Sequence, residues 1–160
     1  MSISGDLKRE LPILMTLMCL IVPALQFCAP ESCYEETISQ VKAGFYQTGT
    51  GNIVTADTVS LYGLEMVSTP VYNKSADLTG ISFPLDPSTE SCTYVFIING
   101  ITDTVTFRYS SFPHLISKEC GYSMFHTLDS YNSTRNLIDT IIIRNRNITI
   151  PYEENIRIFF

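Results

Sequence analysis

Residues 92–109, CTYVFIINGITDTVTFRY, predict a β-hairpin that decides the fold class of the chain. Both halves of this stretch are rich in β-branched and aromatic residues, and Asn99-Gly100 lies between them. Asn-Gly suits a two-residue type I′ turn, because both central positions of that turn need a positive φ. We therefore expect Ile98 to lie opposite Ile101, and this pair sets the register of the whole hairpin.

The register gives the hairpin one apolar face and one polar face. Directly opposed residues share a face, so the apolar face consists of Cys92, Tyr94, Phe96, Ile98, Ile101, Val105, Phe107 and Tyr109. The other face is mostly threonine, with Arg108. Asp103 is the exception on the apolar face, and we expect water to reach it because it lies near the turn. A two-stranded ribbon cannot bury such a face alone, so other strands must complete the core.

The rest of the chain is patterned as further short strands separated by turns. We interpret residues 68–77 as a loop containing Pro70, and residues 110–113 as a break after the hairpin. The other expected strands cover residues 39–45, 58–66, 78–85, 115–128, 137–144, 147–150 and 156–160. Turn signals every ten residues or so favour an all-β fold, namely an immunoglobulin-like antiparallel β-sandwich of about seven to eight strands.

The N-terminal region is typical of an exported protein. Residues 11–25 form an uncharged apolar run that is short for a membrane span and suits the core of a signal peptide. Cleavage after the small residue Ala24 is one reading, and cleavage just before Cys28, with lipid on that cysteine, is another. An uncleaved anchor or a buried segment is the alternative to export. We expect a signal peptide over residues 1–27, a tether over 28–37 and a β-sandwich domain over 38–160.

Export would place four cysteines in an oxidising compartment that permits disulfides: Cys28, Cys33, Cys92 and Cys120. The hairpin register places Cys92 on the core face, where buried thiols commonly lie. If Cys28 carries lipid, Cys33–Cys120 is the remaining pair. If it does not, Cys28–Cys92 would accompany Cys33–Cys120, and the sequence leaves both schemes open. No CxxC or Cys/His spacing indicates a metal site.

Composition and motifs argue against several function classes. The 160 residues suffice for one domain with a core, and a net charge of −6 without a basic run argues against nucleic-acid binding. No GxSxG, HExxH, phosphate-binding glycine loop or EF-hand loop is present. We expect no cofactor, no metal and no enzymatic activity, with His126 in a structural role and His114 in a loop. A weak calcium site at Asp86 or at Glu153 and Glu154 is a less favoured alternative.

The order of several short motifs resembles a known family. After Cys28 and Cys33, the motifs are Phe45-Tyr46, FPLDP at 83–87, DTVTFRYS at 103–110, ISKECGYSMFHTL at 116–128 and NIRIFF at 155–160. Over nearly the whole mature length, the chain is similar to an uncharacterised family of small Bacteroidetes cell-envelope lipoproteins, a domain-of-unknown-function family. The resemblance implies a β-sandwich at the cell envelope with lipid on Cys28, and it implies no activity.

Three Asp-Thr-apolar triplets resemble the acceptor pattern of Bacteroidetes protein O-glycosylation. They make Thr58, Thr104 and Thr140 candidate O-glycosylation sites. The alternative, which we favour, is that each triplet is a turn aspartate that leads into a strand.

The leading hypothesis is a non-enzymatic cell-envelope protein with a binding or structural role. It would be lipid-tethered to the outer membrane or else periplasmic or secreted, with a protein or glycan partner and no nucleic acid. One alternative is a small outer-membrane β-barrel, although such strands are about ten residues long and these are shorter. The other alternative is a carbohydrate-active accessory domain or enzyme.

Overall fold

The computed structural model describes Cys33 and residues 37–64, 69–151 and 153–160. The chain divides into two compact units, Met1–Tyr34 and Glu35–Phe160, and the fold below is that of the second unit. The expected signal peptide and the candidate lipid site at Cys28 lie outside the described residues. Among the described residues, no helix is long and apolar enough to cross a membrane.

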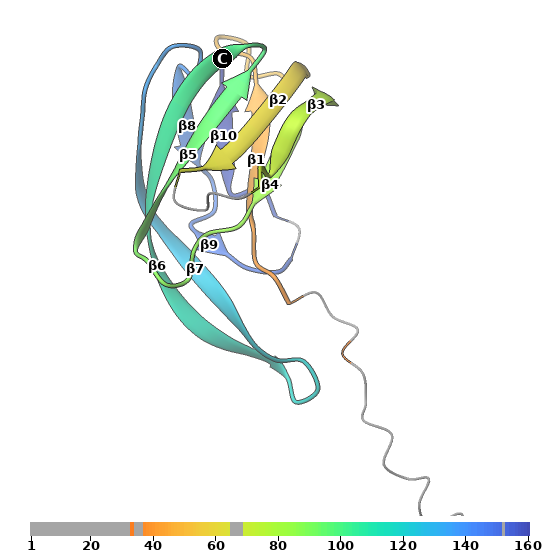
Figure 1. Cartoon of the computed structure of the whole chain (residues 1–160), viewed down its shortest axis with the longest axis vertical. Helices are drawn as coiled ribbons and strands as arrows, with labels where there is room; N and C mark the ends of the chain where they lie inside the picture. The colour runs from red at the N-terminus through yellow and green to blue at the C-terminus, as the bar shows by residue number, and fades with distance from the viewer. Residues whose placement is uncertain (1–32, 34–36, 65–68, 152) are drawn as a thin grey trace, which may run out of the picture. The chain divides into compact units, whose positions relative to one another are not determined.

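Ten strands form two sheets (Figure 1). The smaller sheet has the order β4-β1-β10-β8 and the larger has the order β3-β2-β5-β6-β7-β9. The strands are β1 Val41–Tyr46, β2 Ala56–Gly63, β3 Tyr72–Leu78, β4 Gly80–Phe83, β5 Ser91–Ile98, β6 Ile101–Ser117, β7 Gly121–Ser133, β8 Thr140–Ile143, β9 Asn147–Ile148 and β10 Ile156–Phe159.

The predicted all-β sandwich is confirmed, with two differences in detail. The described chain has ten strands rather than seven to eight, and the pair β1–β10 is parallel, whereas every other strand pair is antiparallel. Each sheet runs openly from one edge strand to the other. The described strands therefore do not form the closed sheet that the outer-membrane alternative requires.

The central hairpin has the predicted turn and register. Asn99 and Gly100 have φ values of 51° and 82°, as a type I′ turn demands. Ile98 pairs with Ile101, and the pairing continues to Cys92 opposite Phe107. β2 and β7 flank the two strands on either side, which places this hairpin at the centre of the larger sheet.

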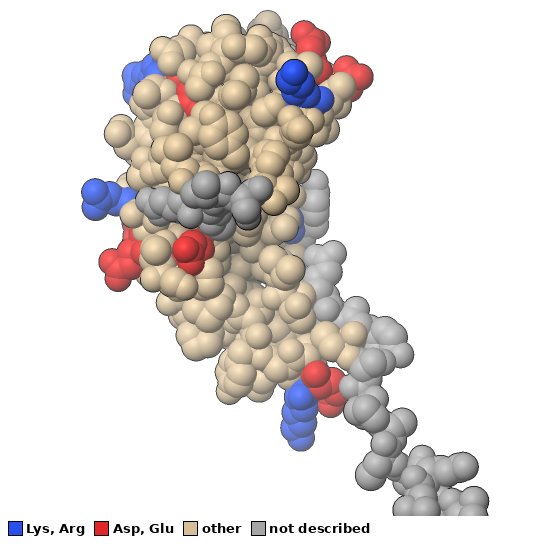
Figure 2. Space-filling view, in the orientation of Figure 1, with Lys and Arg blue, Asp and Glu red and all other residues tan. Residues whose placement is uncertain are grey.

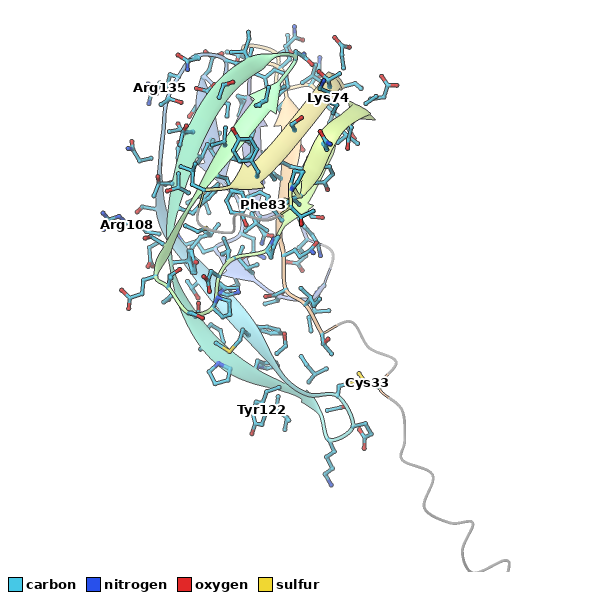
Figure 3. All side chains as sticks on the ribbon, in the orientation of Figure 1. Cys33, Lys74, Phe83, Arg108, Tyr122 and Arg135 are labelled. Atoms are coloured by element: carbon cyan, nitrogen blue, oxygen red, sulfur yellow. The ribbon has the colours of Figure 1, made fainter. Side chains whose placement is uncertain are left out.

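The core lies between the two sheets, and Phe83 of β4 is at its centre. Its ring lies 4.8 Å from that of Tyr94, 6.0 Å from that of Phe96 and 5.6 Å from that of Phe107, measured between centroids. All three partners belong to the larger sheet, and Phe83 itself is fully buried. Figure 3 shows the labelled Phe83 between the sheets. The apolar face of the hairpin is therefore covered as its sequence requires.

Three sequence-based boundaries are wrong. β6 continues to Ser117 through the predicted break at 110–113, and Pro113 fits there because this part of β6 pairs only with β7. Residues 115–128, expected as one strand, contain the turn between β6 and β7. Part of the expected loop 68–77 is the edge strand β3, in which Lys74 and Asp77 have positive φ values. The other expected strands overlap β1, β2, β4, β8, β9 and β10.

The far ends of β6 and β7 form a two-stranded extension, which we call the ribbon. It comprises residues 111–117 and 121–126, paired from Ser111 opposite His126 to Ser117 opposite Gly121. Beyond the short β9, neither of its strands has a further strand neighbour in the described sheet. Figure 1 shows the ribbon projecting below the two sheets.

Candidate functional site

Asp103 is a buried carboxylate at the centre of a hydrogen-bond network. It is 2 % exposed, so the expectation that water reaches it is wrong. One carboxylate oxygen accepts hydrogen bonds from Thr134 Oγ1 at 2.7 Å and from the Asn136 backbone N–H at 2.8 Å. The other accepts from the backbone N–H groups of Leu137 at 2.8 Å and Ile138 at 2.9 Å. The residues that cover Asp103 come from a loop more than thirty positions away in the sequence.

The pKa of Asp103 reflects two opposing effects. Burial raises it, while the four hydrogen bonds to the carboxylate lower it, and the net result lies below the ordinary value. Asp103 is therefore held ionised by donors that are all satisfied. This arrangement anchors the loop before β8 and offers no free proton acceptor for chemistry.

His126 is buried, in a position that suits the structural role expected from the sequence. It is 2 % exposed, its Nδ1 lies 2.8 Å from Ser111 Oγ, and its ring meets that of Tyr109 edge-on. Burial lowers the pKa of His126, so the neutral imidazole is the stable form in the fold. His114, in contrast, is exposed on the ribbon and stacks on Phe125.

We expect the stability of the protein to fall as the pH falls below about 6.5, because of His126. Its pKa is lower in the folded chain than in the unfolded chain, so acid favours the unfolded state over this window. Urea denaturation at about pH 7.5 and about pH 5 measures the loss. His126→Gln should show less of it, and His114→Gln, at the exposed histidine, should behave like the parent. Equal pH dependence in both variants would refute the role of His126.

A small hollow lies on the outer face of the four-stranded sheet. Its volume is about 260 Å³, and its floor includes the cross-strand pair Gly44 and Gly80. Beside it, Glu154 accepts a hydrogen bond from Tyr46 Oη at 2.6 Å and pairs with Arg157 Nε at 2.5 Å. Arg157 also lies over the Tyr46 ring, 4.6 Å from its centroid. The hydrogen bond to Glu154 is the main cause of the raised pKa of Tyr46.

The two glycines of this hollow should differ in their tolerance of a methyl group. A Cβ at Gly80 would lie 2.6 Å from the backbone carbonyl of Ala43, whereas one at Gly44 would first meet the Oε2 atom of Glu154. We expect Gly80→Ala to cost about 1–3 kcal/mol of stability, since backbone must shift. Gly44→Ala should cost less, because a side-chain terminus can move away. Thermal unfolding of the two variants tests the order, and a harmless Gly80→Ala would contradict it.

A larger hollow of about 570 Å³ lies at one edge of the six-stranded sheet, where β2 and β3 meet. Tyr62 and Leu64 contribute apolar surface, and Ser60 and Lys74 contribute polar groups. The Lys74 backbone N–H donates to Ser60 Oγ at 2.9 Å, which ties the two strands together. Figure 3 places the labelled Lys74 at the edge of this sheet. The hollow combines aromatic and polar groups and could hold an uncharged polar ligand.

The described cysteines fall into two kinds. Cys92 is 3 % exposed in the core, as predicted from the hairpin register. Cys33 and Cys120 are both disulfide-bonded, which supports the predicted Cys33–Cys120 bridge. Cys120 lies in the turn between β6 and β7, at the end of the ribbon.

The ribbon carries an exposed apolar patch formed by Pro113, Leu115, Tyr122 and Met124. Leu115 pairs with Tyr122 and Pro113 pairs with Met124, so all four share one face. Tyr122 is 71 % exposed, the highest value among the large hydrophobic side chains described, and Leu115 is 49 % exposed. Figure 3 shows Tyr122 on the outer surface of the ribbon. Tyr122, Met124 and His126 alternate along β7, yet Tyr122 is exposed and His126 is buried.

The opposite face of the ribbon rests on the segment that precedes β1. Ser123 Oγ donates a hydrogen bond to the Thr37 carbonyl, and Ser39 Oγ donates to the Met124 carbonyl at 2.5 Å. Both serines are buried. These contacts hold one side of the ribbon and leave the patch on the other side exposed.

The three candidate O-glycosylation sites differ in accessibility. Thr58 and Thr140 are exposed, whereas Thr104 is half-buried and follows the buried Asp103. They lie on β2, β6 and β8 and do not converge on one site. Asp103 of the second triplet lies within β6, where its carboxylate anchors a loop.

The charged groups of the described residues do not gather into a metal centre. Among the residues that the structure describes, no group of three or more His, Cys, Asp and Glu side chains could hold a metal ion. Asp86 accepts a hydrogen bond from the Ser88 backbone N–H at 2.8 Å, as in a turn. Glu153 accepts from Asn145 Nδ2 at 2.7 Å. Figure 2 shows acidic and basic groups scattered over the visible face.

Comparison with known proteins gives one match. Residues 58–160 match the model of a family described as "Family of unknown function (DUF6452)". The matched region includes most of the six-stranded sheet, the ribbon and the C-terminal strand β10. Neither the curated proteins nor the solved structures include a match.

Proposed function

We propose that this chain, which belongs to DUF6452, a family of unknown function, is a non-enzymatic β-sandwich of the cell envelope with a binding or structural role. In this proposal the chain is exported and tethered to a membrane by lipid on Cys28. The resemblance to small Bacteroidetes lipoproteins favours the outer membrane as the site of this tether.

The observation that carries the proposal is the disulfide-bonded state of Cys33 and Cys120. Disulfides persist in oxidising compartments such as the periplasm or the cell exterior and are rare in the cytosol. The apolar run over residues 11–25 supplies the signal that export needs. Cys28 follows that run closely, in the position expected of a lipid-bearing residue.

A non-enzymatic role is supported by the duties of the buried polar groups. Asp103 accepts four hydrogen bonds and anchors a loop. His126 lies against Ser111 and Tyr109, with 2 % of its surface exposed. A general acid or base must reach its substrate, and these two groups are enclosed by their partners.

The intact mass of the mature protein from its native host tests the proposal. We expect a chain that begins at Cys28 and carries two or three acyl groups. Reduction should then add the mass of two hydrogen atoms, which corresponds to one bridge. A chain that begins near Leu25 without lipid would overturn the tether, and a cytoplasmic chain that begins at Met1 would overturn export.

Glycan binding at the larger hollow is a second candidate, favoured by the exposed Tyr62 that lines it. Aromatic rings beside polar groups suit a carbohydrate-binding accessory domain. Affinity electrophoresis against a panel of purified polysaccharides tests it. This role would be supported if a polysaccharide retards the parent and the Tyr122→Ala variant but not the Tyr62→Ala variant. The role would be refuted if no polysaccharide retards the parent, or if both variants are retarded as the parent is.

A further inference from the structure

The end of the ribbon combines exposed apolar side chains with a nearly neutral surface. Leu115 and Tyr122 form an exposed cross-strand pair close to the turn. The only Lys, Arg, Asp or Glu residues between positions 111 and 128 are Lys118 and Glu119, whose charges cancel, in a chain with a net charge of −6. This part of the molecule can therefore approach an anionic surface with less repulsion than the rest of the protein.

The residue types of the patch suit the boundary between water and lipid. Tyrosine is enriched at membrane interfaces, because its ring is apolar and its hydroxyl remains hydrated. A neighbouring lysine can extend its charge toward the headgroups while its stem lies on apolar surface. Leu115 would contribute the purely apolar contact, and Lys118 in the turn would contribute the charge.

The covalent chain limits how far this turn can lie from a lipid anchor. Cys120 belongs to the turn, and a Cys33–Cys120 bridge would fix Cys33 to it. Five positions separate Cys28 from Cys33, and five extended residues span at most about 17 Å. A lipid on Cys28 therefore could not enter a membrane without bringing the end of the ribbon to within about that distance of it.

We propose that the ribbon patch docks on the lipid surface of the membrane in which Cys28 is anchored. This inference rests on the proposed function, because the anchor selects lipid as the occupant of the patch. Contact at the ribbon would orient the sandwich with the β5–β6 turn away from the membrane, since Ile101 and Ser117 are the two ends of the same strand β6.

A single-tryptophan reporter tests the docking, because the chain contains no tryptophan. The mature protein with Tyr122→Trp is reconstituted in vesicles of phosphatidylethanolamine and phosphatidylglycerol, some of them with brominated acyl chains. We expect the emission to shift to shorter wavelength and to be quenched by the brominated lipid. Ile101→Trp, at the other end of β6, is the matched control and should show neither change. Unquenched emission from the vesicle-bound Tyr122→Trp variant would overturn the docking while leaving the anchor intact.

A second experiment separates the docking from the anchor. Exported Cys28→Ser protein, which cannot carry the lipid, is mixed with the same vesicles and its partitioning is measured. Leu115→Ser should lower this affinity by about tenfold, since burial of one leucine side chain accounts for such a factor. Ile101→Ser, which is 41 % exposed in the parent, should leave it unchanged. No partitioning, or equal losses in both variants, would overturn the docking even if the mass of the native protein proves the lipid.

Discussion

A Cys120→Ser variant is expected to lose about 4–5 kcal/mol of unfolding free energy. The reason is the length of the loop that a Cys33–Cys120 bridge closes, which covers more than half of the 160 residues. In the chain-entropy model, the bridge restricts the unfolded chain, and its removal returns that entropy. Urea denaturation of parent and variant measures the difference, and addition of a reductant to the parent should reproduce it.

The pattern among cysteine variants identifies the pairing. Cys33→Ser and the double variant should lose the same free energy as Cys120→Ser, because all three remove one bond. Cys92→Ala, in the core, should keep the response to reductant. Additive losses at Cys33 and Cys120, or a Cys33→Ser variant as stable as the parent, would contradict the bridge. The variants should retain the strand signal in circular dichroism, since the two sheets do not depend on the bridge for their strand pairing.

The central hairpin could be predicted from the sequence because its information is local. Asn99-Gly100 specifies the turn, and the alternation of side chains from Cys92 to Phe107 then specifies the register. The conclusion that another layer must cover the apolar face also follows from the hairpin alone. The sequence does not state which segment covers it, and the central role of Phe83 became visible only in the packed sandwich.

The ribbon could not be predicted, because its signals depend on neighbours. Pro113 in a central strand would break the pairing, and it is tolerated where β6 has β7 as its only partner. Tyr122, Met124 and His126 alternate along β7, but alternation alone cannot distinguish a face that meets the core from one that extends past it. The fold separates the two: β9 pairs with β7 at His126, which is buried, whereas Tyr122 lies beyond β9 and is exposed.

Asp103 shows the same limit for the polar groups. From its place near a turn, exposure to water was the natural expectation. The loop that buries it is brought back by the return of the chain from β7 to β8, a contact that no local pattern encodes. The available clue was an acid on an otherwise apolar face, and a buried acid needs hydrogen-bond donors or an opposite charge.

The second large effect is expected at this aspartate, where Asp103→Ala should cost on the order of 3 kcal/mol. The change leaves the backbone N–H groups of Asn136, Leu137 and Ile138 without their acceptor. Removing one partner of a buried hydrogen bond costs about 1–3 kcal/mol, and relaxation of the loop toward water recovers part of the sum. Chemical denaturation measures the loss. Thr134→Ala, which removes one of the four donors, should cost about 1 kcal/mol.

The pH dependence gives Asp103 a signature of its own. Its pKa in the folded chain is below the ordinary value of 3.8. Its contribution is therefore present above about pH 4 and is lost as the pH falls through the folded pKa. This window lies below that of His126, so the two groups can be measured separately. Asp103→Asn should remove the acid-dependent loss, because the amide does not titrate.

Asp139→Asn is the matched control, since Asp139 also begins an Asp-Thr-apolar triplet. Asp139 is exposed, and its described carboxylate bond is the one it accepts from Thr48 Oγ1 at 2.5 Å. An exposed carboxylate with one neutral donor should contribute little to stability, so this variant should be about as stable as the parent. If Asp103→Asn and Asp139→Asn proved equally harmless, the loop before β8 would not depend on Asp103. O-glycosylation of Thr104 would then be the remaining explanation of the triplet that begins at Asp103. If only Asp103→Asn loses stability, the carboxylate has the structural duty that its four donors indicate.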